Sequence, residues 1–388
     1  MHDVHPVSNA PVRVALIHYR DDAAIGGSLR VGQLLGNHLD NTRIEPHFIF
    51  AYGGPGPVTA TTRIPVHFVN SNGPSDLSGW IRIRRLIRNL RPHVLHFLNP
   101  VFWADIALLD WHGPRINHLH GPFPERISGF RDQLTFGVFR STMTRNVCVS
   151  KDLEVHALKI GAAREGAVCT IYNAVDCAEF RDLPASQEAR EQLGLPQDAY
   201  LLGMICRLVP EKGCHDGIRL LKHLPSDYHL VLCGAGILAE ELRQFVASNG
   251  LEHRVHFLGS RDTIRPVYAA IDNLLFLSRI EPFGLVIAEA MASGVPVVGV
   301  VGEGGYTDLE YPLVTPDNAL LLRPDRLLAR NEPVPDQLLL CLAEAIISLR
   351  ESPKRRSLMA QRAKKWVEER FDIKRQAMEM ADLYDSLV

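Results

Sequence analysis

Short apolar runs alternate with longer amphipathic segments along almost the whole chain. The apolar runs are bounded by Gly, Pro and polar residues, which is typical of strands buried in a parallel sheet. The segments between them carry apolar residues at helical spacing. Because this alternation occurs twice, it predicts an α/β protein with two doubly wound, Rossmann-like parallel-sheet domains.

The expected elements divide the chain near residue 176, so the domains are set at 1–176 and 177–370. Strands are predicted in the first domain at 12–18, 44–50, 93–97, 116–120, 147–150 and 167–171, and in the second at 200–206, 229–233, 255–258, 273–277 and 295–300. A hinge is expected over 173–184, loops over 53–62 and 330–335, and closing helices over 335–349 and 354–370.

Two glutamates stand on either side of a strand–loop–helix junction in the second domain. Glu281 follows the strand 273–277, and Glu289 lies eight positions later in an apolar helix over 285–293. Ligands of open parallel sheets bind at the C-terminal ends of the strands. Both carboxylates are therefore expected at one crevice, where they would accept hydrogen bonds from hydroxyl groups. Without its surroundings, such a pair would be a solvated loop residue and an ion-pair partner.

Two cations flank the turn after the strand 200–206. Arg207 ends that strand, and Lys212 precedes a helix that begins near Gly213. Cations beside the N–H groups of a helix start are well suited to bind a diphosphate. Taken alone, the same two residues fit the surface of an ordinary turn equally well.

Gly-rich turns follow two further strands. Gly26 and Gly27 open a helix after the first strand, and Gly304 and Gly305 lie in the turn after 295–300. Glycine allows close approach of the backbone to a ligand and aims N–H groups at an anion. The first turn lacks the full Gly-x-Gly-x-x-Gly pattern, so a nicotinamide cofactor is not indicated.

His118 and His120 end the strand 116–120 on the same side of the sheet. An isolated histidine is usually a hydrogen-bonded structural residue, and His-x-His also raises the question of a metal site. No Cys or carboxylate follows at ligand-like spacing, so we expect no metal here.

Together these motifs resemble the retaining glycosyltransferases of family 4, which have the GT-B fold. The run from Glu281 to Glu289 is similar to the Glu-x7-Glu signature, and the run from Gly203 to Gly213 is similar to the Gly-x-x-x-Arg-Leu…Lys-Gly segment. Weaker matches are Ser150 and Asn173, with Ala174 in place of the usual Gly. In that family a terminal helix returns to the first domain, and 371–388 is its expected counterpart.

The resemblance also implies roles for these residues. Arg207 and Lys212 would hold the phosphates of a nucleoside diphosphate sugar. Glu289 would hold the ribose hydroxyls, whereas Glu281 and His120 would contact the transferred sugar. The implied donor-binding residues are Gly26, Gly27, Arg207, Lys212, Glu281, Phe283, Gly284, Leu285, Glu289, Gly304 and Gly305. The implied secondary or acceptor-side residues are His118, Ser150 and Asn173, and Asp308 or Glu310 stands where many relatives place a carboxylate.

The implied activity is transfer of a hexose-type sugar from a UDP- or GDP-sugar to a hydroxyl of a saccharide, a lipid-linked acceptor or a small molecule. Retention of the anomeric configuration, without a covalent enzyme intermediate, follows from the resemblance alone. No cofactor is expected, and because the chain lacks an Asp-x-Asp motif, no metal is expected either. The alternatives are a sugar-nucleotide epimerase, a phosphorylase that needs pyridoxal phosphate, and a non-catalytic nucleotide-sugar-binding protein.

Composition narrows the setting of this activity. The chain has 388 residues, enough for two cores, and a net charge of −2, which argues against nucleic acid as a partner. Its seven cysteines have no paired spacing, as expected in a reducing compartment. The first residues have no basic segment followed by an apolar core, so no signal peptide is expected and the expected localisation is cytoplasmic, including the inner face of the membrane.

Residues 80–91 predict a basic amphipathic helix. Apolar residues at 80, 83, 86, 87 and 90 recur at helical spacing, and five arginines lie mainly elsewhere. Most such helices simply have a solvated charged face. Because basic amphipathic helices also bind anionic lipid headgroups, a peripheral membrane contact from Trp80 to Arg91 is the alternative.

Overall fold

The computed structural model describes residues 10–22, 27–98, 101–121, 130–308 and 311–388. The chain forms two compact units. The first contains residues up to 149 together with 154–172 and 373–388, and the second contains 150–153 and 173–372. Gly26 and Glu310, which the sequence analysis singled out, lie outside the described residues.

The first unit is built on a parallel sheet with the strand order β3-β2-β1-β4-β5-β6-β7. The strands are β1 (Val12–Arg20), β2 (Ile44–Tyr52), β3 (Val66–Ser71), β4 (Val94–Phe97), β5 (Arg115–Leu119), β6 (Arg145–Cys148) and β7 (Val168–Thr170). The helices are α1 (Gly27–His38), α2 (Pro57–Thr61), α3 (Leu77–Leu90), α4 (Phe102–Ala107), α5 (Phe130–Thr142), α6 (Lys151–Lys159) and α14 (Ile373–Asp385).

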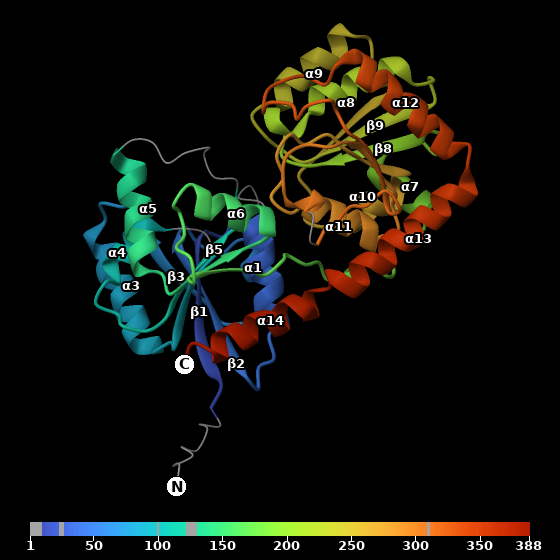
Figure 1. Cartoon of the computed structure of the whole chain (residues 1–388). Coiled ribbons are helices and arrows are strands. Elements are labelled where there is room, and N and C mark those ends of the chain that lie inside the picture. Colours follow the sequence, from blue (N-terminus) through green and yellow to red (C-terminus); the bar gives the residue numbers. More distant parts are fainter. Residues whose placement is uncertain (1–9, 23–26, 99–100, 122–129, 309–310) are drawn as a thin grey trace. The chain divides into compact units, whose positions relative to one another are not determined.

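Helices cover both faces of this sheet (Figure 1). On one face, Leu35 of α1 and Tyr384 of α14 join the buried residues of β1 and β2. On the other face, Ile83 of α3 and Trp103 of α4 pack on the opposite side of the same strands. The C-terminal helix α14 thus completes the core of the first unit.

The second unit has the strand order β10-β9-β8-β11-β12-β13, again all parallel. The strands are β8 (Tyr200–Ile205), β9 (Tyr228–Cys233), β10 (Val255–Gly259), β11 (Asn273–Phe276), β12 (Val297–Val300) and β13 (Ala319–Leu322). The helices are α7 (Ser186–Leu193), α8 (Cys214–Leu220), α9 (Ala239–Ser248), α10 (Arg265–Ala270), α11 (Leu285–Ala292), α12 (Asp336–Arg350) and α13 (Pro353–Arg370). Short 3₁₀ turns are η2 (Cys177–Phe180), η3 (Pro210–Lys212), η4 (Leu221–His223) and η5 (Gly305–Thr307).

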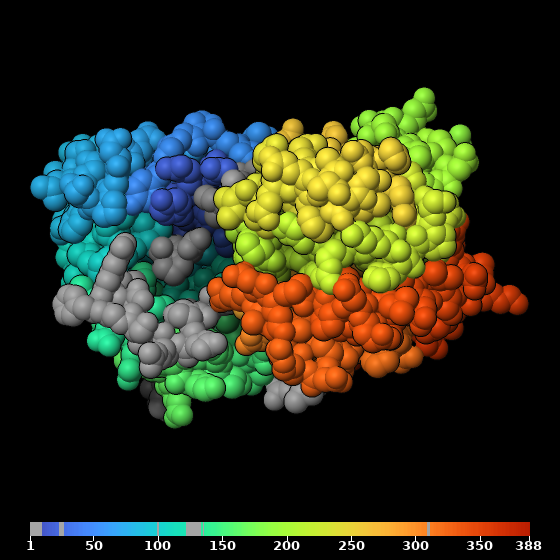
Figure 2. Space-filling model, turned by 90° about the horizontal axis from the view of Figure 1, so that it is seen from above, coloured from blue at the N-terminus to red at the C-terminus, as the bar shows by residue number. Residues whose placement is uncertain are grey.

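The second unit is also doubly wound. Helices α8, α9 and α12 contribute Ile218, Leu242 and Leu342 to one continuous core with the sheet. The outward side of α9 belongs to the surface drawn in yellow in Figure 2. The apolar helix α11 is buried from Ile287 to Ala292, which explains why it lacks a polar face.

Three elements differ from the expectations. The strands β3 and β13 were not predicted; both lie at the edge of a sheet, where β3 carries polar residues and β13 is only partly buried. The expected loop 53–62 contains the short helix α2, whose N–H groups at Val58 and Thr59 are bound by the Asp21 carboxylate. The Gly/Pro-rich composition of this segment predicted a loop, so the helix was not expected.

Candidate functional site

The strand order of the second sheet reverses between β8 and β11, which are hydrogen-bonded neighbours. Such a switch point leaves a crevice at the carboxyl ends of the two strands, since their connections lead to opposite faces. Lys212 follows β8, and Glu281 follows β11. The predicted cation and carboxylate therefore lie at the position where open α/β sheets bind ligands.

Backbone hydrogen bonds tie the three loops at this edge together. The Arg279 amide donates to the Glu211 carbonyl at 2.8 Å, and the Glu303 amide donates to the Arg279 carbonyl at 2.7 Å. The Glu281 amide then donates to the Glu303 carbonyl at 2.9 Å. The loops after β8, β11 and β12 thus form one connected frame that fixes the side chains they carry.

Lys212 and Glu281 contact each other directly. The Lys212 Nζ atom lies 2.5 Å from Oε2 of Glu281, and both side chains are mostly buried. Burial lowers the pKa of Lys212, but the charge and the hydrogen bond of Glu281 outweigh this effect and raise it above its usual value. Lys212 is therefore an ammonium ion at neutral pH, with the Glu281 carboxylate as its ionic partner.

Arg207 is the more exposed of the two predicted cations. Its side chain is 54% exposed and lies 3.7 Å from Glu211 Oε1, a distance at which an exposed ion pair contributes little. The guanidinium is therefore free to turn toward a ligand. Its positive charge also acts to lower the pKa of Lys212, as expected for two nearby cations.

A buried ion pair missed by the sequence analysis fastens this frame to the core. Arg279 pairs with Asp216 of α8, and both side chains are 4% exposed. Arg279 also donates from Nη1 to the Leu277 carbonyl at 2.6 Å and from Nε to the Glu332 carbonyl at 2.9 Å. The position of Arg279, two residues before Glu281, was the only available sequence signal.

The glycines after β12 are required by close contacts. A side chain at Gly304, whose φ is 140°, would overlap the Glu281 carbonyl group. A side chain at Gly305 would overlap Ser150. The turn is closed by Tyr306, whose hydroxyl lies 2.5 Å from the Gly302 amide. The predicted glycine pair is thus part of the frame.

The loop from Phe283 to Leu285 has two distinct roles. Phe283 is buried against Phe371, with ring centroids 5.5 Å apart, so it supports the loop from within the core. Gly284 has a φ of 93° and begins α11, which has no side-chain cap. Among the described residues, none accepts a hydrogen bond from the Leu285 amide outside the helix. Uncapped N–H groups at a helix start are suited to bind an anion.

Glu289 is held by a tyrosine that the sequence analysis did not select. The Tyr268 hydroxyl donates to Glu289 Oε2 at 2.9 Å and also lies 3.1 Å from the Val286 carbonyl. Burial, followed by the charge of Glu289, raises the pKa of Tyr268 well above its usual value. Tyr268 therefore remains a hydrogen-bond donor and fixes the orientation of the carboxylate.

The secondary residues have structural contacts of their own. The hydroxyl of Ser150 accepts a hydrogen bond from the Leu153 amide at 3.3 Å in the first turn of α6. The Asp308 carboxylate accepts one from the Lys151 amide at 3.0 Å, which gives this carboxylate a partner. Asn173 is 4% exposed, at the start of the connection between the units.

The first unit gathers histidines at the corresponding edge of its own sheet. The rings of His96 and His118 stack at 5.2 Å, and those of His118 and His120 are 4.1 Å apart, as their alternation along β5 predicts. His18 of β1 lies 3.2 Å from the Ser28 hydroxyl in α1, directly after Gly27. His18 and His96 were not predicted as site residues, although His18 ends an expected strand.

These histidines are neutral. Burial, followed by the neighbouring imidazoles, lowers the pKa of both His118 and His120 well below the usual value. Their ring nitrogens have no hydrogen-bond partner among the described residues. A buried imidazole without a partner is available to the hydroxyl group of a ligand.

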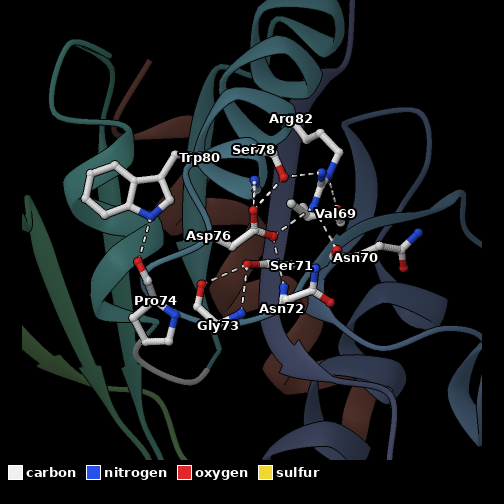
Figure 3. Close-up of polar contacts among 11 residues, drawn as sticks. Val69, Asn70, Ser71, Asn72, Gly73, Pro74, Asp76, Ser78, Trp80 and Arg82 are labelled. Atoms are coloured by element: carbon white, nitrogen blue, oxygen red, sulfur yellow. Dashed lines mark hydrogen bonds and ion pairs between the residues drawn. The ribbon is translucent and has the colours of Figure 1, made fainter.

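The basic helix α3 is partly neutralised by its own surroundings (Figure 3). Arg82 donates to the Val69 carbonyl at 2.7 Å and pairs with Asp76, the N-cap of α3. Both Arg84 and Arg88 pair with Asp110. The Trp80 indole donates to the Pro74 carbonyl at 2.9 Å. Three of the five arginines therefore have acidic partners.

Nowhere in the part of the chain that the structure describes do three or more His, Cys, Asp or Glu side chains converge as metal ligands would. Within the same residues, every helix is too short or too polar to cross a bilayer.

Two Rossmann-like parallel sheets in one chain are the architecture of the GT-B class of glycosyltransferases. Residues 25–179 match the family model described as Glycosyltransferase Family 4, and residues 185–366 match the model described as Glycosyl transferases group 1. The chain belongs to this glycosyltransferase family.

Solved structures share the whole fold. The Anabaena HepE structure in complex with UDP-glucose superposes with a TM-score of 0.80 at 22% identity and covers 97% of this chain and 100% of its own. WaaG, a glycosyltransferase involved in lipopolysaccharide biosynthesis, has a TM-score of 0.70 at 16% identity, with 96% and 99% covered. At such identities the likeness establishes the fold.

Curated relatives match over different lengths. An uncharacterised glycosyltransferase of Methanocaldococcus jannaschii is 33% identical over 42% of this chain and 43% of its own. The lipopolysaccharide core glycosyltransferase LpsE of Rhizobium meliloti is 29% identical over 58% of this chain and 60% of its own. The N-acetyl-alpha-D-glucosaminyl L-malate synthase of Bacillus anthracis is 27% identical over 79% of this chain and 87% of its own. The chain thus spans less than two thirds of the length of the first two of these relatives.

Proposed function

We propose that this protein is a retaining glycosyltransferase that moves a hexose-type sugar from a nucleoside diphosphate sugar to an acceptor hydroxyl. The observation that carries this proposal is the Lys212–Glu281 pair, 2.5 Å apart at the switch point of the second sheet. An ammonium group and a carboxylate side by side match the two halves of such a donor, an anionic diphosphate and a hydroxyl-rich ring.

Binding of the donor would exchange the partners of this pair. The diphosphate replaces Glu281 as the partner of Lys212, with Arg207 and the Leu285 amide as further hydrogen-bond donors. Glu281 then accepts hydrogen bonds from sugar hydroxyls, and Glu289, held by Tyr268, accepts them from the ribose. No buried charge loses its partner in this exchange, which keeps its cost low.

In the transfer step, the bond between the anomeric carbon and the phosphate oxygen breaks while the bond to the acceptor oxygen forms. The acceptor proton passes to the leaving phosphate oxygen on the same face of the sugar, which gives retention. Lys212 and Arg207 stabilise the negative charge that develops on the leaving diphosphate, so they act mainly in the transition state. His120, as a neutral imidazole, is proposed to contact the transferred sugar.

For the substrates, we propose a UDP-sugar as the first candidate donor and a GDP-sugar as the second. The UDP-glucose complex of HepE supports the first choice. The names of the relatives include a lipopolysaccharide core glycosyltransferase and an N-acetyl-alpha-D-glucosaminyl L-malate synthase, so the proposed acceptor is a saccharide, a lipid-linked glycan or a small hydroxylated molecule. A peripheral membrane contact through the outer side of α3 is proposed for a lipid-linked acceptor.

Thermal-shift screening with uridine, guanosine and adenosine diphosphate sugars tests the donor. The proposal expects stabilisation by one nucleotide class, followed by NMR detection of a product whose anomeric configuration equals that of the donor. Inversion would contradict the retaining assignment. Conversion of the nucleotide sugar without any acceptor would favour an epimerase instead. Donor binding without turnover by any acceptor would indicate a binding protein.

A further inference from the structure

Two cysteine thiols bracket the loop that carries both predicted phosphate-binding cations. Cys206 directly follows β8, and Cys214 is the first residue of α8. Their sulfur atoms are 3.7 Å apart, in hydrogen-bond contact. Arg207 and Lys212 lie between them in the sequence. The spacing of these two cysteines does not match a recognised motif, so the contact is seen only in the folded chain.

We propose that Cys206 and Cys214 form a reversible dithiol–disulfide site that controls donor binding at the adjacent loop. The assignment rests on the proposed function, because the loop is taken to hold the donor diphosphate. Its oxidant is a low-molecular-weight disulfide of the glutathione type.

The two thiols differ in a way that fits attack by one and resolution by the other. Cys206 is half-buried, whereas Cys214 is 1% exposed. The hydrogen bond from Cys214 lowers the pKa of Cys206, with help from Lys212 and Arg207, although burial opposes this shift. The same hydrogen bond and burial raise the pKa of Cys214. Thiolates are the attacking species in disulfide exchange, so Cys206 is the first residue to react.

The exchange balances in two steps. The Cys206 thiolate attacks one sulfur of the small disulfide, which breaks its S–S bond, forms a mixed disulfide and releases one small thiolate. Cys214 then loses its proton and attacks the Cys206 sulfur, which releases the second small thiol. Two protein thiols are oxidised to one disulfide, and one small disulfide is reduced to two thiols.

A disulfide would displace the loop. Its S–S bond is about 2.05 Å long, so the two sulfur atoms must approach by about 1.6 Å from their present 3.7 Å. The loop has little free space at Gly213. The Leu277 carbonyl oxygen lies 2.6 Å, and Arg279 Nη1 3.2 Å, from the position that a Cβ atom would take there. We therefore expect Lys212 to move relative to Glu281. A displacement of about 1 Å at such a site reduces productive binding by about tenfold or more.

The remaining cysteines of this region provide controls. Cys233, on the neighbouring strand, directs its thiol to the Gly259 carbonyl at 3.7 Å. Cys341 of α12 is exposed and reports on unselective oxidation. Cys341→Ser should therefore leave both cross-linking and donor binding unchanged.

Peptide mapping tests the site directly. The full chain is incubated with oxidised glutathione, digested with trypsin without reduction and analysed by mass spectrometry. Trypsin cleaves after Arg207 and after Lys212, so Cys206 and Cys214 fall into different peptides that only a disulfide can join. The proposal expects this joined peptide in the wild type and in Cys341→Ser, its loss in Cys206→Ser and in Cys214→Ala, and its disappearance after dithiothreitol.

Donor binding is measured on the same samples by thermal shift with UDP-glucose and GDP-mannose. Oxidation should weaken binding by about tenfold in the wild type, reversibly, and should have no effect in Cys206→Ser, which lacks the attacking thiol. Glutathione on Cys341 alone, or a stable mixed disulfide on Cys206 without the joined peptide, would overturn the site. Because mapping needs no donor, its failure leaves the proposed function intact. A joined peptide in a protein that binds no nucleotide sugar would instead overturn the proposed function.

Discussion

Tyr268 positions Glu289 through one hydrogen bond of 2.9 Å, and its ring packs edge-on against Phe180. Tyr268→Phe keeps the ring and removes the donor. Because hydrogen bonds to charged groups contribute about 1.5–3 kcal/mol, we expect donor affinity to fall by about tenfold or more. Isothermal titration with the preferred nucleotide sugar measures this loss.

Tyr200→Phe is the matched control for this variant. It also removes a buried hydroxyl, which donates to Asn273 at 2.6 Å, but Tyr200 begins β8 at the edge opposite the site. Both variants should lose stability, and only Tyr268→Phe should lose affinity. Equal affinities in the two variants would contradict the positioning role of Tyr268.

Gly304 combines a positive φ with a close contact, so Gly304→Ala should disturb the loop after β12. We expect a loss of stability of about 1–3 kcal/mol from the backbone conformation and weaker donor binding from the displaced loop. Gly250→Ala separates the two effects, because Gly250 has a φ of 64° and no atom within 4 Å of the added methyl group. Unfolding by urea together with donor titration should show a stability loss in both variants and an affinity loss at Gly304 alone.

At the scale of elements, the Arg279–Asp216 pair joins the loop after β11 to α8. Arg279→Leu leaves the buried Asp216 with Arg219, whose side chain is 22% exposed, as its remaining ionic partner among the described residues. We expect a loss of unfolding free energy of about 3–5 kcal/mol, measured by urea denaturation. Arg362→Leu removes an exposed pair with Asp317 and should cost at most about 1 kcal/mol. Similar losses in both variants would show that the buried pair does not anchor the frame.

The helix α3 presents a smaller basic face than its sequence indicates. Arg85 is exposed beside Ile81, which is 58% exposed, and no acid among the described residues lies within ion-pair distance of Arg85. If this face contacts a membrane, Arg85→Glu should reduce co-sedimentation with vesicles containing phosphatidylglycerol and leave the low binding to phosphatidylcholine vesicles unchanged. Failure of the wild type to bind anionic vesicles would exclude the membrane contact.

At the scale of the whole molecule, the histidines of the first unit make stability depend on pH. Burial lowers the pKa of His18 to about 4 and that of His96 to about 3, against 6.5 for a free imidazole. Between these values the unfolded chain binds protons that the folded chain does not, so the free energy of unfolding falls as the pH decreases from 6.5 toward 4. Urea denaturation across this range measures the slope.

His96→Phe should reduce this pH dependence, because it removes one group that protonates only on unfolding. The exposed His112 offers the control, since His112→Gln should leave the slope unchanged. A free energy of unfolding that stays level or rises on acidification would contradict the neutral histidine cluster.

Much of the fold could be predicted because buried parallel strands are short and almost wholly apolar, as β11 and β12 are. The edge strand β3 lacks that pattern because polar residues interrupt it, and the apolar edge strand β13 was not recognised. Lys212 and Glu281 were each predicted at the carboxyl end of a strand, whereas the structure shows that these two strands are neighbours at a switch point. The Arg279–Asp216 and Tyr268–Glu289 contacts were not predicted, because each joins residues far apart in the sequence whose meeting depends on how helices pack on the sheet.

The binding of nucleotide sugars by wild type and Lys212→Ala tests the central claim most directly. Isothermal titration with UDP-glucose, GDP-mannose and ADP-glucose should show binding of one class by the wild type. The variant should bind it at least about tenfold more weakly, because the diphosphate loses its buried cation. Lys222→Ala, which removes an exposed lysine of η4, should bind like the wild type. Equal affinities of the wild type and Lys212→Ala, or no binding of any nucleotide sugar, would contradict the account.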